Sequence, residues 1–269
     1  MQSPISSKAL AHLFLYAVLP AFSELVRLDP EARERMTPWN ITLSMGIIRK
    51  NAVTLHIKNG DMIFYPNCLT KTDVTFLFLS EKHLNAFFNG NPWALPLVTR
   101  GLWRIRFLSD FSKLAKRLNL FLEDNTSKCP IYTQLAFFIG GLGLVSLATL
   151  DSFSIALLKK LPPGLAEFSI EHPSIPPLWF EHDQASVRAG QGPPPRKPDV
   201  RLRFTTLEIA NGAIRNDIDT MAAIGAQRIC VEGLTPLAEG LGVMMERLQV
   251  YLERPHTGFQ TSSISVIRL

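Results

Sequence analysis

The residues of this chain best suited to metal chemistry are its histidines, since imidazole is a common metal ligand. Two short stretches, Glu171-His172 and Glu181-His182-Asp183, place a carboxylate beside an imidazole. Both flank irregular proline-rich sequence and lack the spacing of a ligand set. The six histidines are His12, His56, His83, His172, His182 and His256. We expect solvated loop histidines and no metal site.

Motifs for phosphate binding or covalent catalysis are also missing. Gly140-Gly141-Leu142-Gly143 has neither the spacing of a dinucleotide-binding loop nor the Lys-Ser/Thr of a phosphate loop. The sequence holds no nucleophile elbow and no zinc-protease helix motif. We therefore expect no catalytic residue and no cofactor. An enzyme stays open as an alternative, without a residue set that can be named for it.

Cysteine usage indicates the compartment. Cys68, Cys129 and Cys230 are isolated and odd in number, which fits a reducing environment without disulfides. Cys230 sits in an apolar run, so we expect it in the core. The expected location is cytoplasmic, with peripheral contact at a membrane as a further option.

One group of basic residues has aromatic residues interleaved with it. Aromatic side chains among cations can bind nucleic acid or anchor a protein at a lipid interface. No nucleic-acid module is present, so no nucleic acid partner is expected. We favour the interpretation that Lys113, Lys116 and Arg117 form the solvent-exposed face of a helix that buries Leu114 and Leu118. Contact with an anionic membrane is kept as an alternative. The group comprises Arg100, Arg104, Arg106, Lys113, Lys116 and Arg117, with Trp93, Trp103 and Phe107.

Composition sets broad limits. The chain has 269 residues, of which 46% are hydrophobic and 19% charged, so it can build real cores and is not mainly disordered. A net charge of +5 favours anionic surfaces only modestly, and a simply basic soluble protein is the plainer interpretation. The length suits one large or two ordinary domains.

The stretch Asp199–Glu253 contains the clearest pattern of elements. Val200, Leu202 and Phe204 alternate with polar residues, as in a half-buried strand. A short helical piece, the apolar run Ile229-Cys230-Val231 and an amphipathic segment from Leu237 to Leu252 follow. The same order occurs between Asp73 and Glu123, which indicates a duplicated unit. Matched anchors are Asp73-Val74 with Asp199-Val200, Leu97 to Gly101 with Ile229 to Gly233, and Arg117-Leu118 with Arg247-Leu248.

This order of strand, Ser/Thr-started helix, short strand ending in Gly and C-terminal helix resembles the sterol carrier protein type 2 family. The resemblance implies a curved five-stranded sheet covered by helices, with an apolar tunnel that holds a lipid. This chain differs by being doubled, and it lacks a residue set that would fix the ligand. The predicted fold is α+β: two tandem copies, residues 1–124 and 125–269, of a mostly antiparallel five-stranded sheet covered by helices.

The resemblance also implies a function. The predicted partner is a hydrophobic small molecule (lipid, sterol or isoprenoid-like), carried without catalysis. The alternative is an accessory or scaffold protein that docks on an enzyme or a membrane surface. An ordinary closed core formed by the same residues has equal standing with a cavity. The candidate cavity walls in the second copy are Phe204, Ile229, Leu237, Leu241, Met244, Met245 and Leu248.

Earlier segments fill in the first copy. The apolar run from Ala9 to Phe22 predicts a first helix that continues to Arg27 and ends at Asp29-Pro30; a signal peptide is the alternative. Alternating runs predict three strands, two of them joined by Asn59-Gly60 as a hairpin. The strand from Asp73 is also expected to be reached by a hairpin. In the second copy, Phe168-Ser169-Ile170 is expected to take the place of Ile41-Thr42-Leu43.

Two segments of the second copy stand out. Pro130 to Leu150 carries no charged residue and is long enough to span a membrane. Its three mid-run glycines favour instead a buried pair of helices that breaks there, the second from Leu144 to Leu161. The loop from Gly190 to Pro198 is rich in proline, so it is expected to be an exposed hairpin loop, with a polyproline partner site as a weaker option.

Overall fold

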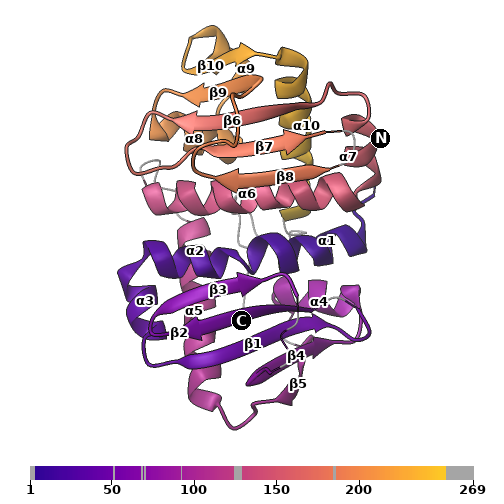
Figure 1. Ribbon diagram of the computed structural model, residues 1–269, viewed down its shortest axis with the longest axis vertical. Coiled ribbons are helices and arrows are strands. Elements are labelled where there is room, and N and C mark those ends of the chain that lie inside the picture. The colour runs from indigo at the N-terminus through magenta and orange to yellow at the C-terminus, as the bar shows by residue number, and fades with distance from the viewer. Residues whose placement is uncertain are drawn as a thin grey trace. The chain divides into compact units, whose positions relative to one another are not determined.

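The computed structural model describes residues 4–50, 52–67, 69, 71–91, 93–123, 129–183 and 186–252. The chain divides into two compact units (Figure 1). We call Ser6–Glu123 the first unit, and Asp124–Glu253 together with residues 4 and 5 the second unit. The predicted boundary at residue 124, and also Cys68, lie outside the described residues.

Each unit combines helices with a five-stranded sheet. The first unit contains α1 (Ser7–Leu13), the π-helical turn η1 (Phe14–Val18), α2 (Ala21–Leu28), α3 (Pro30–Met36), β1 (Asn40–Ile47), β2 (Ala52–Lys58), β3 (Asp61–Tyr65), β4 (Val74–Phe78), α4 (Glu81–Phe88), β5 (Leu97–Arg100) and α5 (Ile105–Leu122). The second contains α6 (Pro130–Leu150), α7 (Ser152–Leu158), β6 (Gly164–Ile170), β7 (Leu178–His182), β8 (Val187–Gln191), β9 (Val200–Phe204), α8 (Leu207–Ile214), α9 (Thr220–Gly225), β10 (Ile229–Gly233) and α10 (Thr235–Leu252).

The two sheets have the same topology. Their strand orders are β3-β2-β1-β4-β5 and β8-β7-β6-β9-β10. One pair in each sheet is parallel, β1 with β4 and β6 with β9, and the other pairs are antiparallel. The predicted class, α+β with two copies of a mostly antiparallel sheet, is thereby confirmed.

The expectation that β4 is reached by a hairpin is wrong. The chain leaves edge strand β3 and crosses to the far side of β1, where β4 pairs in parallel. An aspartate fixes this crossover in both units. Asp73 accepts a hydrogen bond from Thr42 N at 2.9 Å, and Asp199 accepts one from Leu165 N at 2.8 Å. A carboxylate that bonds a strand backbone is a tertiary contact, which period-two patterning does not report.

The same contacts correct the alignment of the copies. They place Thr42 opposite Asp73 and Leu165 opposite Asp199, so Leu165 is the counterpart of Thr42. Ser169, which the sequence comparison put there, lies four residues further along β6. Apolar residues alternate with a period of two, so an alignment shifted by four residues still places apolar residues opposite apolar ones. Only the backbone contact distinguishes the two alignments.

A glycine ends the last strand of each sheet. Gly101 and Gly233 have φ angles of +85° and +99°, a conformation that side chains rarely adopt. A Cβ atom there would lie 2.6 Å from Asp73 O and 2.2 Å from Asp199 O. The two glycines that the sequence comparison matched therefore share a positive φ angle and a close approach to the backbone of the neighbouring strand.

The first helical layer is also repeated. Asp29 caps α3 by accepting a hydrogen bond from Ala32 N, and Asp151 caps α7 by accepting one from Ser154 N. The stretch before the first cap, Ser7–Leu28, has 22 residues, and α6 has 21. The π-helical turn η1 takes up the extra residue in the first unit.

Helix α6 runs without interruption from Pro130 to Leu150, so the predicted break at its glycines is wrong. The break comes at Asp151, where α7 begins. The glycines are sites of close packing instead, because a Cβ at Gly141 would lie 2.5 Å from Leu178 Cδ1. By length and composition, Ser7–Leu28 and α6 could each cross a membrane, but most of each is buried within the protein.

Two further expectations for the second unit need correction. The segment after β8 leads to β9, and strands β7 and β6 lie between these two strands in the sheet. The Pro-rich loop is therefore a crossover and not a hairpin. Cys230 is only half-buried, although it lies in an apolar run. It pairs with Arg203 on the outer face of the sheet, while its neighbour Ile229 points inward.

Candidate functional site

The inner face of the second sheet is apolar. On β9, Val200 and Phe204 are buried and Leu202 is partly buried, whereas Arg201 and Arg203 are exposed. The predicted alternation of this strand is therefore confirmed. Residues of β6, β7 and β10 continue the apolar face, namely Ala166, Phe168, Ile170, Leu178, Phe180 and Ile229.

Helices α6, α8 and α10 cover this face (Figure 1). Helix α10 packs on β6, β9 and β10, and α6 packs on β7 and β8. The rings of Phe137 on α6 and Phe204 on β9 meet with centroids 6.3 Å apart. The result is one continuous apolar layer between the sheet and the helices.

The structure brings most of the predicted wall residues together in this layer. Five belong to one buried cluster, and Met245 packs against it: the five are Phe204, Ile229, Leu237, Leu241 and Met244. Leu248 is also buried, beside Gly143 of α6. Leu237, Leu241 and Met244 have no exposed surface, so these three side chains are in close contact with their neighbours. Contact of the seven residues with a ligand stays a prediction.

The seam between α6 and α10 is built differently from the rest of the layer. At two points its α6 side is glycine, with Gly140 facing Met245 and Gly143 facing Leu248. A Cβ at Gly143 would lie 2.8 Å from Leu248, but one at Gly140 would lie 3.8 Å from Met245 Cε. No α6 side chain interlocks with α10 at these two points. The sequence showed these glycines without indicating what they contact.

Polar groups border the layer at the start of α6. The hydroxyl group of Tyr132 is buried without a hydrogen-bond partner, and Arg215 lies over its ring at 5.4 Å from the centroid. Burial raises the pKa of this hydroxyl, so it stays protonated and able to donate. Thr133 Oγ1 next to it donates to Asn211 Oδ1. Sequence analysis missed all four residues. Tyr132 and Thr133 lie in an uncharged hydrophobic run, and Asn211 and Arg215 lie about 80 residues later, at α8 and its end, so only the fold brings them together.

A closed polar network lies at the other end of α6. Asp151 accepts hydrogen bonds from Arg247 Nη2 at 3.1 Å and from the Tyr251 hydroxyl at 2.8 Å. Burial alone would raise the pKa of this carboxyl group, but the bonds from Arg247, Tyr251 and Ser154 together lower it. The network ties α10 to the cap of α7, which is a structural role.

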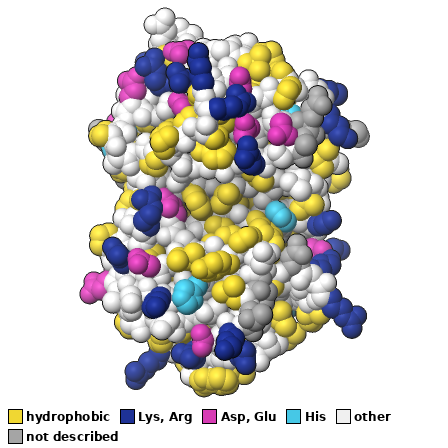
Figure 2. All heavy atoms as spheres, viewed as in Figure 1, with side chains coloured by type: hydrophobic (Ala, Val, Ile, Leu, Met, Phe, Trp, Pro, Cys, Tyr) yellow, Lys and Arg dark blue, Asp and Glu magenta, His cyan; other side chains and the backbone are white. Residues whose placement is uncertain are grey.

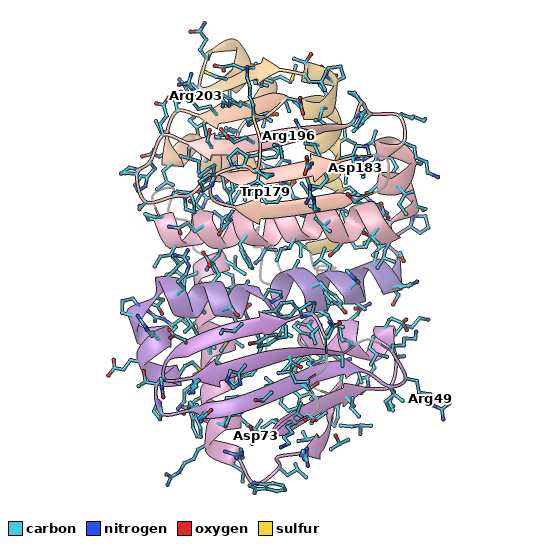
Figure 3. All side chains as sticks on the ribbon, viewed as in Figure 1. Arg49, Asp73, Trp179, Asp183, Arg196 and Arg203 are labelled. Atoms are coloured by element: carbon cyan, nitrogen blue, oxygen red, sulfur yellow. The ribbon has the colours of Figure 1, made fainter. Side chains whose placement is uncertain are left out.

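The outer face of the same sheet is charged. Arg196 and Arg203 lie on this side of the sheet (Figure 3). Arg203 pairs with Glu171 at 3.0 Å, Arg201 with Glu167 at 3.6 Å, and Arg196 of the crossover with Glu181 at 3.0 Å. An open hollow of about 640 Å³ lies beside this face. Its lining is mostly charged, so it does not suit a hydrophobic ligand: Arg196, Lys197, Pro198, Asp199, Arg201, Glu232 and Gly233.

The histidine groups do not gather. His172 bonds Ser174 at 2.9 Å. The expectation of a solvated loop histidine is wrong for His182, which is buried at the end of β7. Across the residues that the structure describes, no three His, Cys, Asp or Glu side chains are placed to hold a metal ion.

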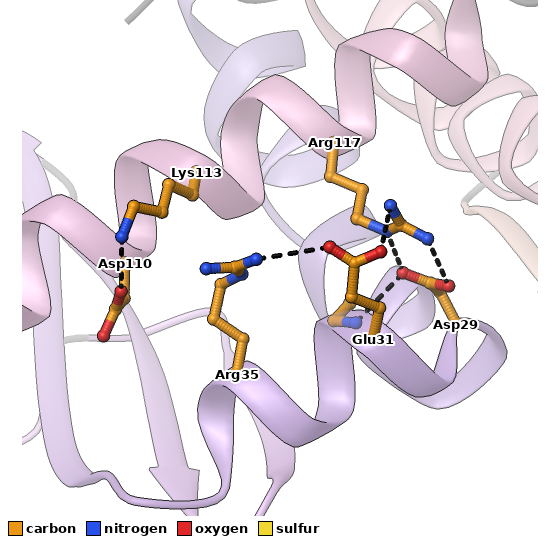
Figure 4. Close-up of polar contacts among 7 residues, drawn as sticks. Asp29, Glu31, Arg35, Asp110, Lys113 and Arg117 are labelled. Atoms are coloured by element: carbon orange, nitrogen blue, oxygen red, sulfur yellow. Dashed lines mark hydrogen bonds and ion pairs between the residues drawn. The ribbon is translucent and has the colours of Figure 1, made fainter.

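The basic helix of the first unit was interpreted only in part correctly. Leu114 and Leu118 of α5 are fully buried, and Lys113 on its other side pairs with Asp110. Arg117, however, is not a solvated charge: it forms a two-point ion pair with the buried Asp29 and a further pair with Glu31 at 2.6 Å (Figure 4).

Comparison with known proteins adds to this geometry. No family model matches the sequence, and no curated protein matches it. Among solved structures, the chain is similar to sterol carrier protein domain 2 of Helicoverpa armigera, at 16% identity over 49% of this chain and 98% of that one, with a TM-score of 0.34.

Two other solved structures are also similar to part of the chain. Sterol carrier protein 2 of Yarrowia lipolytica, in its apo form, matches at 12% identity over 40% of this chain and 92% of that one, with a TM-score of 0.32. A ubiquinone synthesis protein described as UbiJ-SCP2 matches at 13% identity over 54% and 93%, with a TM-score of 0.29.

Proposed function

We propose that the second unit binds a hydrophobic small molecule, of the lipid, sterol or isoprenoid-like class, between its sheet and α10, without catalysis. The proposal is supported by a difference between the two units in the types of side chain that fill their apolar layers. Of the ten aromatic ring pairs among the described residues, nine lie in the first unit, and five of these join two buried phenylalanines; one pair, Phe137 with Phe204, lies in the second unit. Stacked rings close a core rigidly, whereas aliphatic and methionine side chains adapt.

The C-terminal helices show the difference at matched positions. Helices α5 and α10 both have 18 residues, and Arg117 and Arg247 occupy the same place in them. Counted from these arginines, Phe107 and Phe111 correspond to Leu237 and Leu241, while Leu114 and Ala115 correspond to Met244 and Met245. The second unit therefore has leucine where the first has rings, and the adaptable side chain of methionine where the first has leucine and alanine.

The facing helices differ as well. Counted from the capping residues Asp29 and Asp151, Val18 and Ala21 of the first unit correspond to Gly140 and Gly143. At these two positions, separating α10 from α6 would break contacts made to glycine and not to an interlocking side chain. We propose this seam as the way in for the ligand, with the buried hydroxyl of Tyr132 available to its polar end.

The proposal is tested by filling the layer with Met244→Trp. We expect loss of uptake of a fluorescent fatty acid or sterol, with a smaller loss of stability than in the matched control, because the ring would occupy the space that the ligand opens. The matched control is Leu114→Trp in the first unit, where overpacking should cost about 1–3 kcal/mol and leave uptake unchanged. Unchanged uptake together with a clear loss of stability in Met244→Trp would reject the site.

The accessory-protein alternative is separated by a different measurement. Mass spectrometry of organic extracts from the purified chain should show a co-purified hydrophobic compound, and Met244→Trp should deplete it. Extracts that are empty for both proteins, with no uptake of added probe, would favour a docking role over a carrying one.

A further inference from the structure

The first unit presents an apolar surface at its last strand and the turn that follows. We call six of its residues the β5 rim. The most exposed is Trp93, at 92%, and Trp103 is 76% exposed. Large apolar side chains grouped on a surface mark sites of interaction, whereas single ones need no explanation. The rim consists of Trp93, Leu95, Leu97, Leu102, Trp103 and Ile105.

The exposure of the rim is built into the local structure. Buried Ala94 and Phe107 anchor the two ends of the segment. Between them, β5 pairs with β4, and Arg104 N donates to Gly101 O at 3.0 Å, closing the turn that carries Leu102 and Trp103. The segment is therefore fixed with its apolar side chains outward.

Most charged residues around the rim are basic, and the acidic Asp73 beside it is paired with Arg104. No Asp or Glu lies between Glu81 and Asp110 in the sequence, and three arginines lie within or beside the rim: Arg100, Arg104 and Arg106. Arg104 is also paired with Asp73 at 3.2 Å, whereas Arg106 is exposed on the first turn of α5. Figure 2 shows hydrophobic side chains at the lower end of this unit with Lys and Arg side chains beside them.

From this arrangement we infer that the β5 rim docks on the surface of an anionic lipid bilayer. Tryptophan prefers the boundary between headgroups and acyl chains, and arginine binds the phosphates above it. Leucine and isoleucine beside the tryptophans would enter the acyl boundary. A protein partner would also cover apolar side chains, but the arginines next to both the turn and the strand favour a uniformly anionic surface.

The test uses the full chain and vesicles of phosphatidylcholine with or without phosphatidylglycerol. We expect co-sedimentation with the anionic vesicles, weakened by salt because surface charges are screened. Trp93→Ala combined with Trp103→Ala should weaken binding at least about tenfold, since two large apolar side chains are lost. Fluorescence of Trp103 should shift to the blue on binding, and the shift should be reduced in Trp103→Phe.

Matched controls separate the rim from general stickiness. Leu102 and Leu120 are 62% and 66% exposed in the same unit, so Leu102→Ala should weaken binding and Leu120→Ala should not. Arg106→Gln should weaken binding about fivefold, and Arg49→Gln, an equal change of charge at another exposed site, much less. Unchanged thermal unfolding of each variant would show that the fold is kept.

Three results would overturn the inference. They are no binding to anionic vesicles, equal loss in the rim and control variants, or self-association of the free protein that the tryptophan substitutions abolish. The last would assign the rim to a second copy of this chain. None of these measurements involves the second unit's ligand, so the inference fails or holds independently of the proposed function.

Discussion

Asp29 and Asp151 occupy the same place in the two units, yet their surroundings differ. Each caps a short helix and binds an arginine of the C-terminal helix. The Arg117 side chain is 27% exposed and shared with Glu31, whereas Arg247 is 6% exposed and also covers the ring of Tyr251. The ion pair of the first unit is thus partly exposed to water, whereas the ion pair of the second unit is buried. The comparison shows that duplication preserved the framework while the surroundings diverged.

The outer faces of the two sheets diverged in the same way. In the first sheet that face holds small neutral groups, with Thr42 Oγ1 bonded to His56 Nδ1 at 3.1 Å and Ser44 Oγ to Val53 O at 3.3 Å. In the second sheet it holds the arginine–carboxylate pairs of β9 and the crossover. The shared topology therefore places no strong demand on this face.

The largest effect should come from removing an arginine. Arg247→Met should cost about 3–5 kcal/mol, because it leaves the buried Asp151 without its partner. Arg117→Met should cost about 1–2 kcal/mol, because water can reach Asp29 in its place. Chemical denaturation of both variants measures the difference. Equal losses would mean that the two pairs are equivalent despite their burial.

A swap of core residues sharpens the comparison of the two layers. Phe111→Leu gives the first unit the residue of the second and should cost about 1–2 kcal/mol through the cavity it leaves. Leu241→Phe makes the reverse change and should reduce uptake of a fluorescent fatty acid, with a smaller loss of stability. The proposal of an adaptable second layer is contradicted if Leu241→Phe is the more destabilising and uptake persists.

The glycines of α6 should respond with opposite signs. Gly140→Ala should stabilise by up to about 1 kcal/mol, since alanine favours the helix and the new Cβ meets only ordinary contacts. Gly141→Ala should destabilise, since its Cβ would lie 2.5 Å from Leu178 Cδ1. Thermal unfolding of the two variants is sufficient to compare them. Stabilisation by both would show that Leu178 moves aside easily.

Acid should produce the smallest effect, because protonation leaves the carboxyl groups in place. The folded pKa of Asp29 and of Asp151 is lowered: burial opposes this in both, and hydrogen bonds, above all from the arginines, outweigh it. The stabilisation is thus present above the unfolded pKa of about 3.9 and is lost as pH falls through the lower folded values. Thermal midpoints below about pH 4 should fall less in Asp151→Asn than in the unmodified chain. Parallel curves for the two proteins would argue against this linkage.

Local signals were enough to predict many elements. Asn59 and Gly60 were predicted as a hairpin turn, and they adopt φ angles of +53° and +80° between β2 and β3. The stop of the first helix at Asp29-Pro30 and the alternation of β9 are also as predicted. Each of these features depends on neighbours a few residues away, so the sequence alone carries it.

What only the tertiary structure decided concerns contacts between distant residues. The parallel crossover depends on Asp73 meeting Thr42, and the continuity of α6 depends on Leu178 and Leu248 filling the space beside its glycines. The true role of Arg117 appears only when Asp29, 88 residues away, is beside it. Composition and periodicity predict which residues turn inward, but they do not say which of them meet. For that reason the sequence predicted the duplicated framework and the apolar layer, and only the folded chain showed where the layer has interlocking side chains and where it has glycine.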